Sequence, residues 1–268
     1  MARDGAFAPG EKSAVRWFAG QPYWWDSHYV QAVDEIVDFL EGDGLSLDGR
    51  RVLDLGCGDG ILTTGLAART PALSVVGLDL HPVDTAFLAA IAAEHGVSLD
   101  QSRPTFGVSQ LSGLGLPDSS VDIVITWSVF EHVSNVPELL GEIRRVLVPD
   151  GLVFIQIWPL FHSEHGSHLW PWFEQPYPHL RLGEHELKAE LRDRTGDAEL
   201  TEAMFDLYSS CNQVTLDELG SALVAGGFYI SKVQTDSSAV HVPPELQSMP
   251  LSLLTTAGVK LTAVNLKS

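Results

Sequence analysis

The segment VLDLGCGDG, residues 52–60, constrains the fold more than any other part of the sequence. An apolar, strand-like run leads directly into glycines at positions 56, 58 and 60, and a helical pattern follows from residue 61. Glycine tolerates positive φ and places no Cβ between the main chain and a ligand. The carboxyl end of a strand is also where open α/β sheets bind their ligands. The segment therefore predicts a strand, a ligand-binding loop and a helix, in that order.

Short apolar runs alternate with helical patterns over the first 158 residues, which is typical of a parallel sheet with helices on both faces. The runs are RVLDL, SVVGLDL, PTFGV, VDIVITW and GLVFIQIW. Thr215 and Glu218 form a capping box that begins a later helix. Two β-rich runs after it, 228–235 and 258–266, are expected to pair antiparallel at the sheet edge. The predicted fold is a doubly wound α/β fold with a mostly parallel, seven-stranded sheet.

The same pattern predicts four parts of the chain. Prolines, aromatic residues and five histidines interrupt the alternation between the last parallel strand and the capped helix, so this part is interpreted as an insertion that recognises the substrate. The parts are an N-terminal helical lid at 1–45, a ligand-binding core at 46–157, the insertion at 158–212, and a C-terminal helix with edge strands at 213–268.

Composition excludes several classes of partner. The 268 residues include 16 Lys and Arg against 35 Asp and Glu, a net charge of -19, so the average field repels phosphate backbones and anionic lipid surfaces. The two cysteines, Cys57 and Cys211, form no metal or redox motif, and no apolar run has the length of a membrane span or a signal peptide. We expect a cytoplasmic monomer or homodimer that acts on a small molecule.

An acidic residue ends the second predicted strand and indicates a nucleoside-containing ligand. Asp79 lies about 19 residues beyond Gly60, where a carboxylate can accept hydrogen bonds from both ribose hydroxyls. A dinucleotide and S-adenosylmethionine both fit that description. The third glycine comes one residue too early for the dinucleotide fingerprint, and Asp54 before the loop suits a ligand with an ammonium group. The spacing favours S-adenosylmethionine.

Four motifs in order resemble class I S-adenosylmethionine-dependent methyltransferases that act on small molecules. They are VLDLGCGDG, VVGLDL, LGLPDSSVDIVITWSVFEHV and LLGEIRRVLVPDGLVFIQI, and they span residues 50–158. The resemblance implies that Asp79 binds the ribose, that Leu80 flanks the adenine, and that Gln110 replaces the usual Asp near the adenine amino group, with Leu111 beside it. It also implies that the methionine portion and the rest of the cofactor contact Asp54, Gly56, Cys57, Gly58, Gly60 and Trp127.

Histidines are the candidate catalytic residues, because a neutral imidazole with a pKa of about 6.5 suits proton removal at cellular pH. His132 follows the fourth strand, and His168 and His179 lie in the insertion, where imidazoles at 162, 165 and 185 also raise the question of a metal. Gly166 and the flanking prolines disfavour a regular scaffold for metal ligands, so an aromatic lid without metal is the prediction. The alternatives are a cyclase or lyase that uses the same cofactor without methyl transfer, and a dinucleotide oxidoreductase.

Overall fold

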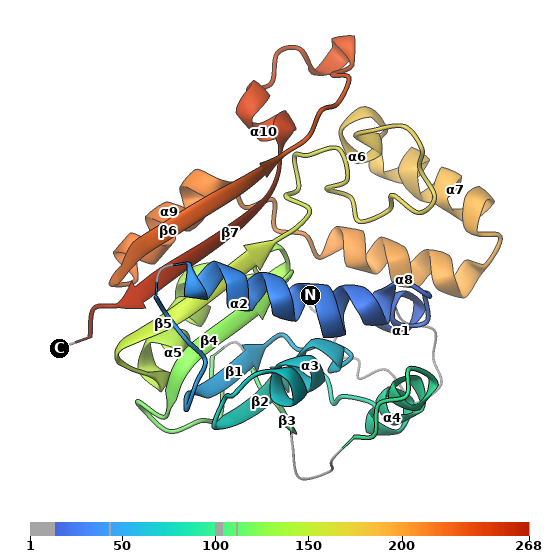
Figure 1. Ribbon diagram of the computed structural model, residues 1–268. Helices are drawn as coiled ribbons and strands as arrows, with labels where there is room; N and C mark the ends of the chain where they lie inside the picture. The colour runs from blue at the N-terminus through green and yellow to red at the C-terminus, as the bar shows by residue number, and fades with distance from the viewer. Residues whose placement is uncertain (1–13, 43, 100–103, 111, 268) are drawn as a thin grey trace.

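The computed structural model describes residues 14–42, 44–99, 104–110 and 112–267. Seven strands form one sheet in the order β3-β2-β1-β4-β5-β7-β6 (Figure 1). The strands are β1 (Arg51–Leu55), β2 (Ser74–Asp79), β3 (Thr105–Val108), β4 (Val121–Trp127), β5 (Leu147–Ile157), β6 (Phe228–Ser237) and β7 (Thr256–Asn265). The first five strands run parallel, and β7 is antiparallel to both β5 and β6. The predicted fold class is confirmed, including the antiparallel edge.

Helices cover both faces of the sheet. The helical elements are α1 (Ala14–Ala19), η1 (Asp26–Ala32), α2 (Val33–Glu41), α3 (Ile61–Arg69), α4 (Thr85–Glu94), η2 (Phe130–His132), α5 (Val136–Val146), α6 (Pro178–Arg181), α7 (Glu184–Thr195), α8 (Ala198–Ser209), α9 (Leu216–Ala225), η3 (Pro244–Leu246) and α10 (Leu251–Thr255). Alternation along β1 separates two cores: Val52 packs with α2 and α3, whereas Leu53 packs with α5 and α9. The central parallel strands β1, β4 and β5 are therefore buried on both faces, as their continuous apolar runs require, whereas the edge strand β3 is partly exposed.

The segment predicted as an insertion holds three helices that the sequence pattern did not indicate, α6, α7 and α8. Before them, residues 158–177 form turns and bends rather than a regular helix, as Gly166 and the prolines suggested. In Figure 1, α8 lies beside α1 at the edge of the molecule. Phe18 of α1 shares a buried cluster with Leu169, Leu187 and Met204. We refer to α1 and residues 158–212 together as the roof.

The helix after the roof begins as its sequence indicates. Thr215 Oγ1 accepts from the backbone N–H of Glu218, and the Glu218 carboxylate accepts from the backbone N–H of Thr215 at 2.9 Å. Gly226 caps the end of α9, and Gly227 follows with φ of 82°. Among the described residues, no helix is long and apolar enough to cross a membrane.

Candidate active site

The glycine loop joins β1 to α3 and is held against the end of β2. The backbone N–H groups of Gly56 and Cys57 donate to the Leu78 carbonyl at 2.7 and 3.1 Å. The Gly58 N–H donates to Oδ2 of Asp79 at 2.9 Å. The loop and the carboxylate at the tip of β2 therefore form one rigid unit, at the sheet edge where ligands of this architecture bind.

The absence of a side chain serves close packing at two of the loop glycines and leaves open space at the third. A Cβ on Gly56 would collide with Val129, and one on Gly60 would lie 2.9 Å from the Phe106 ring, so these two positions permit close packing. Gly58 has φ of 53°, and a Cβ there would meet nothing within 4 Å. Its backbone faces open space in the cavity, which is what a ligand that approaches the main chain requires.

Three carboxylates surround the loop: Asp54, Asp59 and Asp79. Burial raises the pKa of Asp54 to about 7, although Thr63 Oγ1 donates to it at 2.6 Å. Burial also raises the pKa of Asp59, which accepts from Trp24 Nε1 at 2.7 Å. The ionised carboxylates repel one another in this buried, weakly polar environment, so a bound cation would stabilise their charged forms. These three carboxylates fit the positively charged ammonium and sulfonium groups of S-adenosylmethionine.

A single cavity of about 920 Å³ extends from the glycine loop to the roof. Aromatic side chains form its outer wall: Trp24 stacks on Phe18 at 4.9 Å between centroids, and Trp158 contacts Trp170 edge-on at 5.2 Å. The His28 ring stacks on Trp24 at 4.0 Å. Such a wall excludes water and favours an organic ligand with apolar surface.

The other end of the cavity is formed by the residue that follows β2 and by the loop after β3. Leu80, Gln110 and Leu114 line it, and Trp127 lines it from the end of β4. Gln110 exchanges backbone hydrogen bonds with Gly113, both at 3.1 Å, which fixes the turn. The prediction for Leu111 falls on a residue outside the described ranges.

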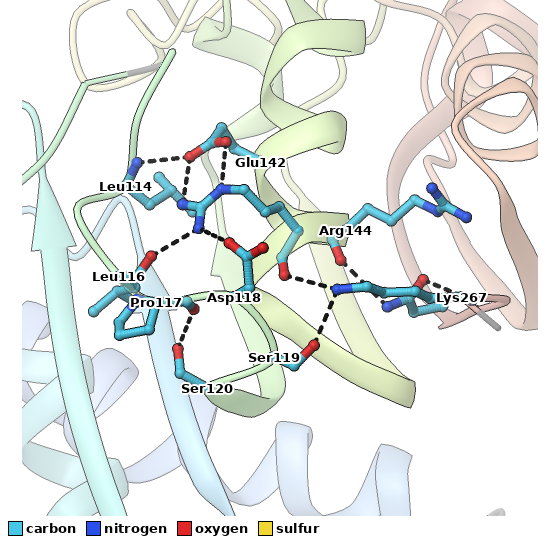
Figure 2. A network of polar contacts seen from close by, with 11 residues as sticks. Leu114, Leu116, Pro117, Asp118, Ser119, Ser120, Glu142, Arg144 and Lys267 are labelled. Atoms are coloured by element: carbon cyan, nitrogen blue, oxygen red, sulfur yellow. Dashed lines mark hydrogen bonds and ion pairs between the residues drawn. The ribbon is translucent and has the colours of Figure 1, made fainter.

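A polar network holds that loop from behind. Figure 2 shows the Leu114 N–H donating to the Glu142 carboxylate of α5, at 3.0 Å. Arg145 bonds both oxygens of Glu142 at 2.8 Å and also Asp118 at 2.7 Å, and it lowers the pKa of Glu142. Lys267 reaches Ser119 at 3.0 Å from the end of the chain. The far wall of the cavity is thus braced by charged groups outside it.

Two of the three candidate histidines lie on the cavity wall. His132 and His168 line it with ring centroids 5.0 Å apart, whereas His179 does not. His179 is buried in the roof, where Nε2 lies 2.6 Å from the carbonyl of Phe161. Burial lowers the pKa of each imidazole to about 4, so all three are neutral at pH 7. The structure thus places His179 outside the cavity that His132 and His168 line.

Behind the two cavity histidines lies a buried polar cluster that the sequence did not reveal. Glu131 is 2% exposed, neither of its carboxylate oxygens has a hydrogen-bond partner among the described residues, and burial raises its pKa to about 7. Its Oε1 lies 3.9 Å from Nε2 of His168, and Nδ1 of His168 lies 3.6 Å from Cys211 Sγ. One ligand atom each from His132, His168 and Cys211 all lie within 4.8 Å of one another.

Some lining residues were absent from the sequence prediction. Asp59 lines the cavity and lies inside the quoted glycine motif, so it had a local signal. Glu131 lies inside FEHV but behind the cavity wall, and its burial had no local signal. The aromatic segment QPYWWDSHYV signalled a lid, although it did not show that Trp24 would donate to Asp59 or that His28 would stack on it.

The comparisons define the class of the protein. The family model of the methyltransferase domain matches residues 25–195, more than half of the chain, and the chain belongs to that family. The resemblance to methyltransferases that the four motifs carry is thereby confirmed at the level of the family. A curated relative, the ubiquinone biosynthesis O-methyltransferase of Hahella chejuensis, is 32% identical over 136 residues, which cover 49% of this chain and 54% of the relative. The chain spans about half the length of this relative.

Solved structures share the fold at low sequence identity. An S-adenosylmethionine-dependent methyltransferase from Mesorhizobium loti superimposes with a TM-score of 0.53 at 18% identity, over 92% of this chain and 99% of that chain. The [4+2]-cyclase SpnF superimposes with the same TM-score of 0.53 at 17% identity, over 97% of this chain and 98% of that chain. The same fold therefore also carries a reaction other than methyl transfer.

Proposed function

We propose that the protein transfers the methyl group of S-adenosylmethionine to an oxygen, nitrogen or carbon nucleophile of a small organic acceptor. The observation that carries the proposal is the single cavity, about 920 Å³, that joins the glycine loop and Asp79 to the aromatic wall and two imidazoles. One end suits a charged nucleoside, and the other suits an organic molecule that must lose a proton. The Hahella relative is named an O-methyltransferase, which supports oxygen as the acceptor atom.

Each end of the cavity has its own task. Gly58 and Asp79 bind the cofactor, and Asp54 and Asp59 offset its positive charge. When bound, S-adenosylmethionine supplies a methyl group already activated for displacement. The aromatic wall formed by Phe18, Trp24, Trp158 and Trp170 excludes water and orients the acceptor, and such alignment supplies roughly 7–11 kcal/mol of the barrier reduction in favourable cases. An imidazole on the cavity wall, His132 or His168, takes the acceptor's proton.

The cyclase or lyase alternative remains a second candidate, and the likeness to SpnF is the observation that favours it. The two functions differ in what becomes of the cofactor. Methyl transfer converts S-adenosylmethionine to S-adenosylhomocysteine, attack on the aminobutyl carbon yields methylthioadenosine, and a cyclisation that only needs the bound cofactor consumes none of it.

The test is an assay with S-adenosylmethionine labelled in its methyl group and a metabolite extract, followed by mass spectrometry of both products. We expect stoichiometric S-adenosylhomocysteine and a labelled acceptor. The Asp79→Ala variant should lose both, whereas Asp38→Ala, an exposed carboxylate on α2, should keep both. Methylthioadenosine, or no consumption of a cofactor that calorimetry shows to be bound, would contradict methyl transfer.

A further inference from the structure

Proton counting around Ser210 assigns the tautomer of His132. Ser210 Oγ lies 2.6 Å from the Leu207 carbonyl and 2.7 Å from Nδ1 of His132. A serine hydroxyl has one hydrogen, and a carbonyl can only accept. The hydroxyl hydrogen therefore goes to Leu207, and Ser210 Oγ must accept the hydrogen of Nδ1. The protonated nitrogen of His132 is Nδ1, which leaves a lone pair on Nε2.

The lone pair of His132 is the one that a substrate can reach. No hydrogen bond to its Nε2 is found among the described residues, and Nε2 is not among their buried unpaired atoms. By contrast, the unpaired Nε2 of His168 and Nδ1 of His179 are buried, and His179 lies outside the cavity. His132 thus combines a fixed ring, a free lone pair and a place on the cavity wall.

Three titratable groups face the His132 ring. Glu131 precedes it in η2, and His168 and Cys211 approach from the roof. His168 is neutral at pH 7 and the thiol of Cys211 has a raised pKa, so neither adds a charge at neutral pH. The carboxyl of Glu131 is the group able to offset an imidazolium formed beside it.

We propose that Ser210 is a positioning residue that holds His132 as the general base, and that the acceptor carries a hydroxyl group whose proton moves to Nε2. This rests on the proposed function. In the step, an oxygen lone pair of the acceptor forms the bond to the methyl carbon, and the carbon–sulfur bond breaks with its electron pair remaining on sulfur. The hydroxyl proton moves to Nε2 and later leaves to solvent. A correctly placed base contributes on the order of 10²–10⁴-fold to such a reaction.

The contact also links the base to the roof. Ser210 is the residue that caps the end of α8, whereas His132 ends the short helix after β4. This hydrogen bond joins residues 78 positions apart in the sequence, and Asn212 Nδ2 from the same segment donates to the carbonyls of Phe130 and Val133.

The tautomer is tested by nuclear magnetic resonance on protein labelled with ¹⁵N-histidine, without substrate. Samples are first dialysed against a chelator, since His132, His168 and Cys211 are close enough to take up a stray metal ion. The His132 signals are assigned by their loss in His132→Gln. We expect Nε2 to give the shift of an unprotonated nitrogen and Nδ1 that of a protonated one. A protonated Nε2 in the wild type would overturn the inference, whatever the activity.

Substitutions complete the test. Ser210→Ala should mix or invert the two tautomers, Ser210→Thr should restore the wild-type pattern, and Ser209→Ala, an exposed neighbour, should change nothing. With labelled S-adenosylmethionine and the metabolite extract, Ser210→Ala should lower methyl transfer by about 3- to 30-fold, a part of the effect of a full base. It should add no further loss in the His132→Gln background. Equal losses in Ser210→Ala and Ser210→Thr, or additive losses with His132→Gln, would contradict the positioning role.

The two proposals fail in different ways. If calorimetry finds no binding of S-adenosylmethionine, or if no methyl group is transferred by a wild type with the expected tautomer, the proposed function fails. If transfer occurs and His132→Gln retains it in full, the function stands and the base assignment fails.

Discussion

The backbone N–H of Gly58 donates to Oδ2 of Asp79 at 2.9 Å, so the carboxylate that the resemblance assigns to the ribose already supports the glycine loop. The other oxygen, Oδ1, accepts from the His81 N–H at 3.1 Å. Because each carboxylate oxygen has two lone pairs, one remains on each for a ligand. Asp79 therefore supports the loop and keeps lone pairs for a ligand, and its substitution tests both functions.

Asp79→Ala should weaken the binding of S-adenosylmethionine by about 10- to 150-fold, which corresponds to roughly 1.5–3 kcal/mol for two hydroxyl groups left without a charged acceptor. Isothermal titration calorimetry measures this directly. The exposed Asp38→Ala serves as control. An unchanged dissociation constant in a folded Asp79→Ala protein would remove the basis of the ribose assignment.

Gly58→Val should abolish cofactor binding, because a branched side chain would fill the open space beside the loop. The φ of 53° also makes any side chain strained, so a control with equal strain is needed. Gly49→Val supplies it: Gly49 has φ of 66°, a Cβ added there would meet nothing within 4 Å, and the residue has no place in the cavity. Loss of binding in both variants at the same unfolding temperature would mean that strain, and not occlusion, is responsible.

Glu131→Gln should flatten the dependence of stability on pH. The pKa of Glu131 rises from 4.5 in the unfolded chain to about 7 in the folded protein, so its stabilising contribution is complete below pH 4.5 and is lost as the pH rises toward 7. At pH 8 the wild type must ionise this buried carboxyl, and the amide avoids that cost. Thermal unfolding of both proteins from pH 4.5 to 8 measures the difference. Parallel curves would show that Glu131 is already ionised at low pH.

Glu142→Ala should loosen the loop that carries Leu114 without touching the cavity. The variant removes the acceptor of the Leu114 N–H and both bonds to Arg145. We expect faster hydrogen exchange in residues 112–120 and a cofactor affinity weaker by about 3- to 10-fold, in line with the loss of one charge-assisted hydrogen bond. Glu142→Gln keeps one acceptor and should fall between. Unchanged exchange would show that the loop is held by packing instead.

Local chemistry explains what could be predicted from the sequence. The strand, the glycines and Asp79 lie within 28 residues of one another, and their roles follow from backbone conformation and strand order. The capping box of Thr215 and Glu218 is equally local. These features need no knowledge of distant contacts.

Tertiary contacts explain what was missed. Glu131, His168 and Cys211 come from three separate segments, and their approach depends on how the roof folds over β4. His179 was a reasonable candidate by residue type, yet its ring turns toward the carbonyl of Phe161 because α6 packs inward. Nothing in the local sequence distinguishes a histidine that faces a cavity from one that is buried.

The buried cluster that Phe18 shares with Leu187 and Met204 has a consequence for how the chain folds. Its members are separated by more than half of the sequence, so this cluster has a high contact order and can close only after α8 has been synthesised. We expect the roof to open more readily than the sheet, which native-state hydrogen exchange would show as lower protection in α7 and α8 than in β1 and β4. Because Trp170 and His168 of the roof line the cavity, such an opening would give a ligand a route in and out while the sheet stays intact.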